Sequence, residues 1–293
     1  MERLTGRLVK VEADLYHVDC GSDRCRCKAR GLFRKLKIEP VAGDFVEFEP
    51  LGGGEGRILA VLPRVNLLLR PPAANIDRLL IVASLDNPPP SLFFIDKLTV
   101  AAESAGIPAA LVLNKTDLSD GHELFSLYTR AGFKVYKTCA ADGTGIEALR
   151  ELLKDGLTVL CGFSGVGKSS LLNRLLPEGS LETSEVSARL KRGRHTTRRV
   201  TLLRLQCGGY VADTPGFSSL DIPRACRVKK HELAARFRDF RPYLGQCRYT
   251  GCAHIKEQGC AVLEALSEGL IAPSRHESYA RLYEELKGIH DWE

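Results

Sequence analysis

The chain has 293 residues, of which 44% are hydrophobic and 27% charged, and its formal net charge is +6. This length is enough for two or three domains of about 100 to 150 residues each. The longest apolar runs, such as LLIVASL at 79–85, are too short to span a bilayer, and the N-terminus lacks the apolar segment of a signal peptide. We therefore expect a cytoplasmic protein with no membrane partner.

The positive charge is concentrated in two segments of the chain. Residues 24–37 and residues 189–204 each contain seven Lys or Arg and no acidic residue. An ordinary solvent-exposed surface mixes both signs, and such a surface is the alternative interpretation. Two uninterrupted basic segments favour a polyanionic partner.

Residues 1–70 alternate apolar and polar positions in short runs that glycine-containing turns separate. This pattern predicts a small all-β domain, an OB-like or SH3-like barrel, of a kind that often presents basic strands to RNA. The segment RPPAAN at 70–75 interrupts the pattern and is expected to be a linker.

Apolar strands alternate with helical stretches over residues 71–222, which are expected to form a central α/β domain. This alternation predicts a parallel sheet covered by helices. The expected strands are 78–84, 109–113, 133–137, 157–161, 200–206 and 209–213, and the expected helices are 92–105, 121–131, 145–154 and 167–176.

Residues 223–293 are basic and helical, and we expect a third domain that ends in an amphipathic helix over 275–287. Three cysteines and a histidine lie within fourteen residues here, and such a ligand set is typical of structural Zn²⁺. Free buried cysteines are the alternative, although a segment with so few apolar residues would need a metal for stability. The predicted zinc ligands are Cys247, Cys252, His254 and Cys260. A second group, Cys20, Cys25 and Cys27, lacks a fourth ligand and is expected to pack inside the barrel.

The segment GFSGVGKS at 162–169 matches the phosphate-binding pattern GxxxxGK[ST] between an expected strand and an expected helix. Its backbone N–H groups and the helix N-terminus would surround a β-phosphate. Lys168 would bridge the β- and γ-phosphates, and Ser169 would ligate Mg²⁺. A glycine-rich turn without nucleotide is the alternative. The predicted residues are Gly162, Phe163, Ser164, Gly165, Val166, Gly167, Lys168, Ser169 and Ser170.

Two further segments are expected around the γ-phosphate. In DTPG at 213–216, Asp213 would hold Mg²⁺ through water and Gly216 would offer its N–H to the γ-phosphate, although a simple Pro-Gly turn is possible. In RHTT at 194–197, either Thr196 or Thr197 would close over Mg²⁺, and we favour Thr197.

The segment NKTD at 114–117 follows a strand and suits a guanine base. The Asp117 carboxylate only accepts hydrogen bonds, so it matches the two N–H donors of guanine and not adenine. Asn114, Lys115 and Thr116 would brace the loop and cover the ring, whereas a helix-starting turn is the alternative. The short segment TCA at 138–140 provides Cys139 and Ala140, and the Ala140 N–H is the candidate contact to the guanine oxygen.

These motifs occur in the order NKTD, TCA, GFSGVGKS, HTT and DTPG, whereas a standard GTPase begins with the phosphate-binding loop. The difference is a circular permutation, which joins two neighbouring termini and opens the chain elsewhere without changing the packed sheet. DTPG now leads almost directly into the C-terminal region. We hypothesise that this attachment links loss of the γ-phosphate to movement of that region.

The N-terminal barrel, the permuted motif order and the C-terminal Cys/His group together resemble the ribosome small-subunit-dependent GTPase A family. VAGD at 41–44 and RPPAANIDRLLIV at 70–82 are similar to further strings of that family. The resemblance covers essentially the whole chain. It implies a GTP hydrolase that acts in late maturation of the 30S subunit, binds 16S rRNA and is stimulated by that subunit.

Hydrolysis requires a group that positions water. Many GTPases have a glutamine directly after the glycine of DxxG, but this chain has Phe217. His195, beside the threonines of RHTT, is the candidate, and the resemblance implies the same assignment. A surface histidine in a basic loop is the alternative. The predicted catalytic residues are His195, Lys168 and Thr197.

Two other functions are compatible with parts of the pattern. The chain is alternatively an RNA-binding assembly factor in which guanine nucleotide is structural and is not hydrolysed. An ATP-dependent P-loop enzyme conflicts with Asp117. We expect a monomer, because the sequence has no exposed heptad repeat or long apolar stripe.

Overall fold

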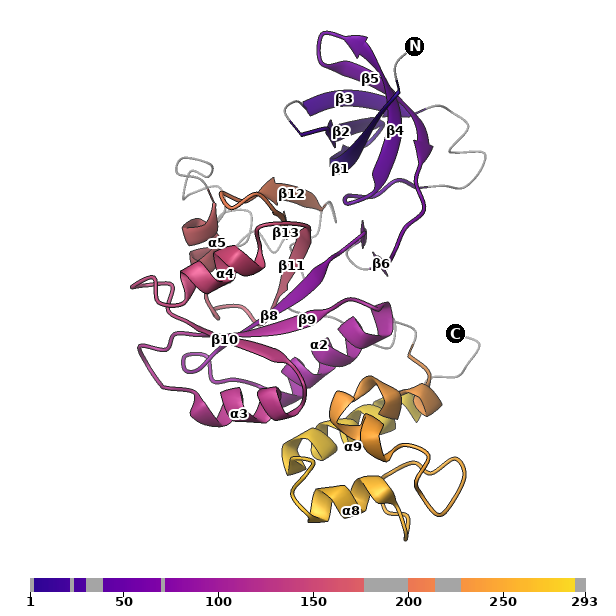
Figure 1. Ribbon diagram of the computed structural model, residues 1–293, viewed down its shortest axis with the longest axis vertical. Helices are drawn as coiled ribbons and strands as arrows, with labels where there is room; N and C mark the ends of the chain where they lie inside the picture. The colour runs from indigo at the N-terminus through magenta and orange to yellow at the C-terminus, as the bar shows by residue number, and fades with distance from the viewer. Residues whose placement is uncertain are drawn as a thin grey trace. The chain divides into compact units, whose positions relative to one another are not determined.

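The computed structural model describes residues 3–21, 24–29, 39–69, 72–176, 200–213 and 228–287. The chain forms two compact units, each of which combines distant segments (Figure 1). No helix in these ranges has the length and apolar character needed to cross a membrane. The first unit comprises Met1–Leu79, Glu147–Leu160 and Ser169–Phe217, and the second comprises Leu80–Ile146, Cys161–Lys168 and Ser218–Glu293.

The first unit begins with a five-stranded barrel. Its strands pair in the order β1-β2-β3-β5-β4, and pairing of β1 with β4 closes it (Figure 1). Leu8, Val18, Phe48 and Ile58 are fully buried in its core. The OB-like barrel expected from the alternating pattern is confirmed. The strands are β1 (Leu4–Glu12), β2 (Leu15–Asp19), β3 (Arg24–Ala29), β4 (Phe45–Gly52) and β5 (Glu55–Val61).

One of two short paired strands lies in the segment at 70–75 that is expected to be a linker. β6 (Leu67–Leu69) and β7 (Pro72–Ala74) pair antiparallel. The Ala74 N–H donates to the Ala42 carbonyl at 2.9 Å, and Ala73 and Ala74 are fully buried. The linker expectation is therefore wrong for residues 72–74, because the small alanines allow a close backbone approach that polar linkers lack.

Three further strands complete the first unit. β11 (Leu157–Cys161) and β13 (Tyr210–Asp213) are parallel, with Val159 opposite Ala212. β12 (Thr201–Arg204) is antiparallel to β13 and also pairs with β1. The expected all-parallel sheet is wrong at β12. A tight turn joins β12 to β13, and a parallel connection requires a crossover of a dozen or more residues.

The second unit contains three strands in the order β10-β9-β8, and β9 and β10 are parallel. Every described side chain of β9 is buried, which explains its continuous apolar run. Ser91 caps the N-terminus of α2, and Gly106 ends this helix in the left-handed conformation. The elements are β8 (Arg78–Ser84), α2 (Leu92–Ala105), β9 (Ala109–Asn114), α3 (His122–Arg130) and β10 (Lys134–Thr138). Two more helices, α4 (Ile146–Leu152) and α5 (Lys168–Leu175), begin where the chain leaves this unit.

The C-terminal part of the second unit is built from short helices. Its longest helix, α9, begins two residues before the expected start and ends at the expected residue. Val228, Leu233, Phe237 and Leu282 share a core with Val100 of α2. The elements are η2 (Lys230–Glu232), η3 (Ala234–Arg236), η4 (Arg238–Tyr243), α8 (Ala261–Ser267) and α9 (Pro273–Lys287).

A buried ion pair fastens α9 to α2. The Arg275 guanidinium donates to the Asp96 carboxylate at 2.5 Å and makes two bonds of 2.9 and 3.1 Å to Asp239. Arg275 and Asp96 are 1% and 0% exposed, and the guanidinium lies 4.7 Å from the centre of the Phe237 ring. The two carboxylates and the aromatic ring replace the hydration that the arginine loses on burial.

Candidate functional site

The segment Gly162–Lys168 forms a tight loop between β11 and α5. Gly167 has φ 95°, and a Cβ atom there would lie 2.2 Å from the Asn114 amide nitrogen. Gly162 has φ 144°, and its Cβ would lie 2.1 Å from the Val82 carbonyl oxygen. Both positions therefore require glycine, because any side chain would clash with backbone or with a buried amide.

Lys168 is the first residue of α5 and folds back over the loop. Its ammonium donates to the carbonyls of Gly162 at 2.7 Å and Phe163 at 2.6 Å. Burial lowers the pKa of the Lys168 ammonium. The first turn of α5 includes Ser169 and Ser170, and the N–H groups of a first helical turn have no acceptor within the helix. A phosphate would meet both the ammonium and these N–H groups.

Asn114 joins the expected base-reading motif to the phosphate-binding loop. Its amide donates to the Val166 carbonyl at 2.9 Å, and its oxygen accepts from the Thr138 hydroxyl at 3.1 Å and the Ala140 N–H at 3.3 Å. Asn114 is 1% exposed. The Thr116 N–H also donates to the Thr138 carbonyl at 3.2 Å. One buried side chain, that of Asn114, therefore holds together three loops that are separated in the chain.

Asp117 lies beside Cys139. The Cys139 thiol donates to one Asp117 carboxylate oxygen at 3.2 Å. Lys115, which has φ 67°, donates from its ammonium to the Asn87 carbonyl. The residues expected to read guanine thus share one loop cluster, and the Asp117 carboxylate is already oriented by a neighbouring donor.

An aromatic pair flanks the phosphate-binding loop. The rings of Phe163 and Phe94 stack with their centres 4.0 Å apart and an interplanar angle of 27°. Phe163 remains 38% exposed. Sequence reasoning missed Phe94, Thr138 and Asn87 as supports of the site. The sequence contained a signal for Thr138. This residue ends β10, and β10 lies parallel to β9, the strand that leads into NKTD.

The residues expected around the γ-phosphate are only partly described. Asp213 is the last residue of β13, and the parallel register places this strand end at the same sheet edge as the end of β11. The phosphate-binding loop begins at that edge. His195, Thr196, Thr197, Gly216 and Phe217 lie outside the described residues.

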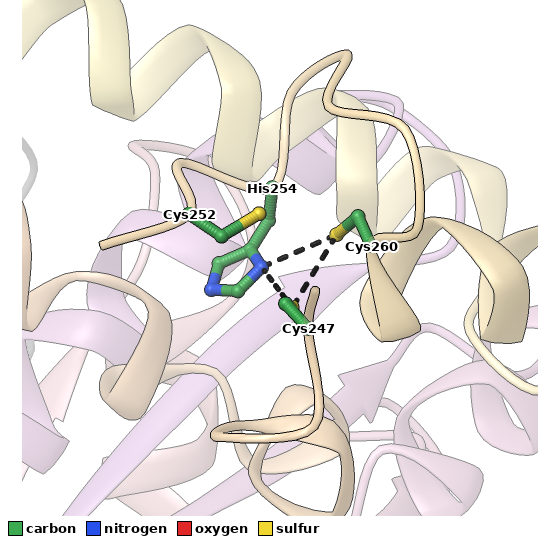
Figure 2. A group of neighbouring side chains, drawn as sticks. All are labelled: Cys247, Cys252, His254 and Cys260. Atoms are coloured by element: carbon green, nitrogen blue, oxygen red, sulfur yellow. Dashed lines mark hydrogen bonds between the residues drawn. The ribbon is translucent and has the colours of Figure 1, made fainter. Parts of the chain in front are cut away.

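Four side chains of the C-terminal region converge on one point (Figure 2). Their ligand atoms all lie within 4.8 Å of one another. The separations are 3.8 Å between the Cys247 and Cys260 sulfurs, and 3.5 and 3.3 Å from these sulfurs to His254 Nδ1. A tetrahedral zinc site with Zn–S bonds of about 2.3 Å and Zn–N bonds of about 2.0 Å has S–S edges of about 3.8 Å and S–N edges of about 3.5 Å. The four residues, of which Cys252 is the fourth, therefore fit one zinc ion.

Neighbouring groups hold this cluster in shape. Burial alone would raise the pKa of the Glu257 carboxyl, but backbone N–H groups of the loop, including those of Ile255 and Ala253, lower it to about 2. The Tyr279 hydroxyl donates to the Ala253 carbonyl at 2.7 Å, and a His276 ring nitrogen lies 2.7 Å from the His254 carbonyl oxygen. Sequence reasoning missed His276 and Tyr279, because they reach the loop from α9, and it missed Glu257, whose role depends on the fold of the loop itself.

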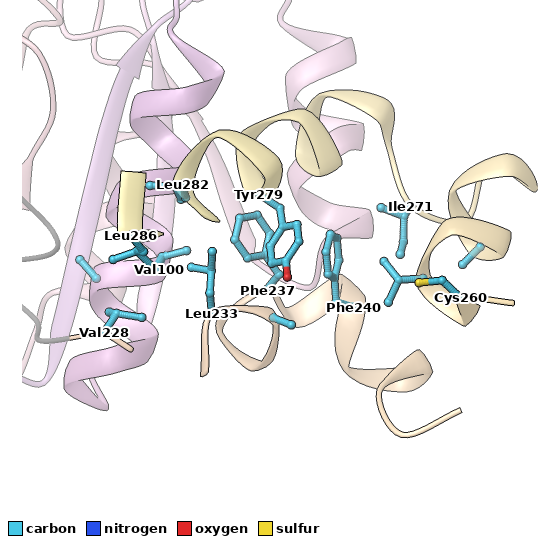
Figure 3. Packing of buried hydrophobic residues seen from close by; sticks show 14 residues of the cluster. Val100, Val228, Leu233, Phe237, Phe240, Cys260, Ile271, Tyr279, Leu282 and Leu286 are labelled. Carbon is cyan, nitrogen blue, oxygen red and sulfur yellow. The ribbon is translucent and has the colours of Figure 1, made fainter. Parts of the chain in front are cut away.

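Burial changes the ionisation of the cluster residues. It lowers the pKa of His254, which favours the neutral imidazole, and it raises the pKa of Cys252 to about 12, which keeps this thiol protonated in the absence of a metal. A bound cation would displace the thiol protons. Figure 3 shows that Cys260 also belongs to the apolar core formed with Phe240 and Ile271.

The barrel cysteines differ from this cluster. Cys27 is fully buried in the barrel core, and Cys20 and Cys25 pack against that core. In the part of the chain that the structure describes, His, Cys, Asp and Glu side chains form a potential metal site only at 247–260. Cys20, Cys25 and Cys27 thus contribute to the packing of the barrel, as expected.

Known proteins match the chain along nearly its whole length. Residues 61–223 match the RsgA GTPase family and residues 5–58 match the RsgA N-terminal domain. The chain is 42% identical over 290 residues to the small ribosomal subunit biogenesis GTPase RsgA of Caldanaerobacter subterraneus, covering 98% of this chain and 97% of the relative. It is 43% identical over 286 residues to the protein of the same name from Carboxydothermus hydrogenoformans, covering 97% and 98%.

Two solved structures have the same fold. YjeQ from Thermotoga maritima superposes with a TM-score of 0.85 at 35% identity and covers 99% of this chain and 100% of its own. YloQ, described as a circularly permuted GTPase, superposes with a TM-score of 0.80 at 31% identity and covers 98% and 96%. The permuted order inferred from the motifs is thus also the order of a solved relative. On these matches, the chain belongs to the RsgA family of GTPases.

Proposed function

We propose that this protein is a GTP hydrolase that acts in late maturation of the 30S ribosomal subunit, binds 16S rRNA and is stimulated by the subunit. The relatives named above are small ribosomal subunit biogenesis GTPases. The basic segments at 24–37 and 189–204 suit a polyanionic partner. We further propose a cytoplasmic monomer that alternates between GTP and GDP.

The observation that carries this proposal is the Asn114 side chain, which bonds to Val166 of the phosphate-binding loop and to the loop that follows β10. One triphosphate of guanosine would thereby be held at both ends. A nucleotide site that is this well ordered suits catalysis, because the reacting phosphate must be positioned within fractions of an ångström.

Each residue has a proposed task in the site. Asp117 reads the guanine N–H groups, the Ala140 N–H meets the guanine oxygen, and Lys168 contacts the β- and γ-phosphates. Ser169, Asp213 and Thr197 are the residues that would hold Mg²⁺, which neutralises phosphate charge when it is bound with the nucleotide. His195 would orient the attacking water, since Phe217 has no polar group to do so.

The C-terminal ligand set is proposed to hold one structural zinc ion. Four protein ligands leave no open coordination position, so the ion would supply stability and would not activate water. The zinc loop, the barrel and the segment at 189–204 would together contact rRNA.

The deciding experiment measures GTP hydrolysis with and without purified 30S subunits across a salt series. Stimulation that decreases steeply with increasing salt is expected, because contacts to RNA phosphates release counterions. Tight guanine-nucleotide binding without turnover, with or without subunits, would instead favour an assembly factor whose nucleotide is structural. His195→Ala should slow turnover and leave nucleotide affinity intact, whereas unchanged turnover would remove His195 from the mechanism.

A further inference from the structure

The loop between two of the cluster cysteines exposes an aromatic side chain. Tyr249 is 52% exposed, the highest value of any aromatic residue that the structure describes. It lies two residues after Cys247 and three before Cys252. The Arg248 guanidinium lies 5.5 Å from the centre of the Tyr249 ring. A large ring is thus exposed to water beside a cation, whereas the nearest apolar side chains in the chain, such as Leu244 and Ile255, are partly buried.

The loop that carries Tyr249 is fixed by contacts that do not involve the ring. The Arg248 N–H donates to the Gly259 carbonyl at 2.8 Å, and a Cβ on Gly259 would lie 3.0 Å from the Arg248 Cβ. Glu257 accepts from the N–H groups of Ala253 and Ile255 at 3.0 and 2.9 Å. A fixed loop loses little conformational entropy when a partner binds to it.

The charge around the ring is positive. Arg248 and Lys256 are exposed, and in the described part of the chain neither has a carboxylate within 4 Å. The nearest acid in sequence, Glu257, is occupied by backbone N–H groups. By contrast, Arg238 and Arg241 are paired with Glu103. Arg248, which lies beside the Tyr249 ring, is therefore available for an anionic partner.

We propose that Tyr249 stacks on an unpaired RNA base and that Arg248 contacts the adjoining phosphate. This inference rests on the proposed function, which makes ribosomal RNA the partner, and it identifies single-stranded RNA as the form that this loop recognises. An exposed ring offers its face to any base, and the neighbouring cations hold the backbone. Within a duplex both faces of a base are already stacked, so duplex RNA would offer Arg248 only its phosphates.

The test uses the full-length, zinc-loaded protein and a short single-stranded oligoribonucleotide, with the same sequence in a duplex as the comparison. Tyr249→Ala should weaken binding to the single strand about tenfold and leave duplex binding unchanged, whereas Tyr249→Phe should bind as the parent does. Arg248→Ala should weaken both and reduce the slope of log affinity against log salt by about 0.7. Zinc content and melting temperature establish that each variant is folded.

A second, direct measurement is needed if Tyr249→Ala loses its zinc, or if the barrel contributes most of the affinity for RNA. Tyr249→Trp in a Trp292→Phe background places a single fluorophore in the loop, and stacking should quench it when the single strand is added. The proposal is overturned if the fluorescence is not quenched, or if Tyr249→Ala loses equal affinity for the single strand and the duplex. It is also overturned if Tyr249→Ala binds 30S subunits more weakly but binds the oligonucleotide unchanged, because Tyr249 would then contact a protein. Turnover by the parent protein with 30S subunits tests the proposed function separately.

Discussion

The nucleotide site and the Cys/His cluster are both made of loops, but different interactions hold their shapes. The nucleotide loops follow strands β9, β10 and β11, and hydrogen bonds of Asn114 join them without a ligand. The segment 247–260 contains no regular helix or strand, and its four ligand side chains converge without any sheet beneath them. Side-chain hydrogen bonds between strand ends therefore join the loops of one site, while the other is proposed to depend on a zinc ion in addition to the hydrogen bonds of its loop.

This difference predicts how each site responds to change. A site held by a sheet should lose function and keep its structure when one functional side chain is replaced. A site held by a metal should lose its structure when one ligand is replaced, because the remaining ligands bind the ion far more weakly.

Cys260→Ser should abolish the zinc site. Structural zinc contributes on the order of 10 kcal/mol in small zinc-binding segments, so its loss should unfold residues 247–260. Metal analysis should fall from one zinc per chain to none, and limited proteolysis should cut within this segment. GDP affinity should stay within about twofold of the parent, since the nucleotide loops are held independently.

The matched control is Cys207→Ser, which replaces a hydrogen-bonded thiol outside the cluster. It should keep its zinc and its protease resistance. A Cys260→Ser protein that lacks zinc and still resists the protease would contradict the distinction between the two sites.

Asp117→Asn should change the base preference from guanine toward xanthine and leave the fold intact. An amide in place of the carboxylate mismatches the guanine N–H donors, and polar mismatches of this kind discriminate by on the order of 10⁴-fold. Competition binding with GTP, XTP and ATP measures the change. Retention of GTP preference would mean that another residue reads the base and would reopen the case for an adenine nucleotide.

Arg275→Met tests the packing beneath the cluster. The substitution leaves the Asp96 carboxylate buried without its cation, and breaking a buried pair costs about 3 to 5 kcal/mol. Chemical denaturation should report this loss in the free energy of unfolding. The control Arg238→Met removes a more exposed arginine from Glu103 and should cost less than about 1 kcal/mol. Equal losses in the two variants would show that burial does not set the energy of these pairs.

Much of the fold is readable from local patterns. The buried strands β8, β9 and β11 have continuous apolar runs, and the barrel strands alternate, so both periods are visible in the sequence. One error arose where distant backbone decided the outcome, and the other where a short turn set the direction of a strand. β7 exists because Ala42 and Leu67 approach it, and the direction of β12 follows from its short turn to β13.

In the candidate sites, too, the sequence identifies some residues, while others become visible only through tertiary contacts. GFSGVGKS, NKTD and the Cys/His spacing identify the groups that would meet phosphate, base and metal. The supports of these groups come from other segments, as Thr138 does for Asn114 and Tyr279 does for the loop of His254. A side chain that acts through a tertiary contact has no fixed spacing from its partner, so no sequence motif identifies it.

Cys139→Ser tests whether the loop of Asp117 depends on one hydrogen bond or on the sheet. The Cys139 thiol donates to the Asp117 carboxylate at 3.2 Å, and a hydroxyl is a better donor than a thiol. If the sheet already fixes the loop, the stronger bond should tighten GDP binding by no more than about threefold. The effect is small because a net hydrogen bond contributes only about 0.5 to 1.5 kcal/mol. Isothermal titration with GDP measures the effect, with Cys207→Ser as the matched replacement outside the site. A tenfold or larger loss in Cys139→Ser alone would mean that the Asp117 loop depends on the size of the sulfur, and that packing contributes more to this site than its hydrogen bonds indicate.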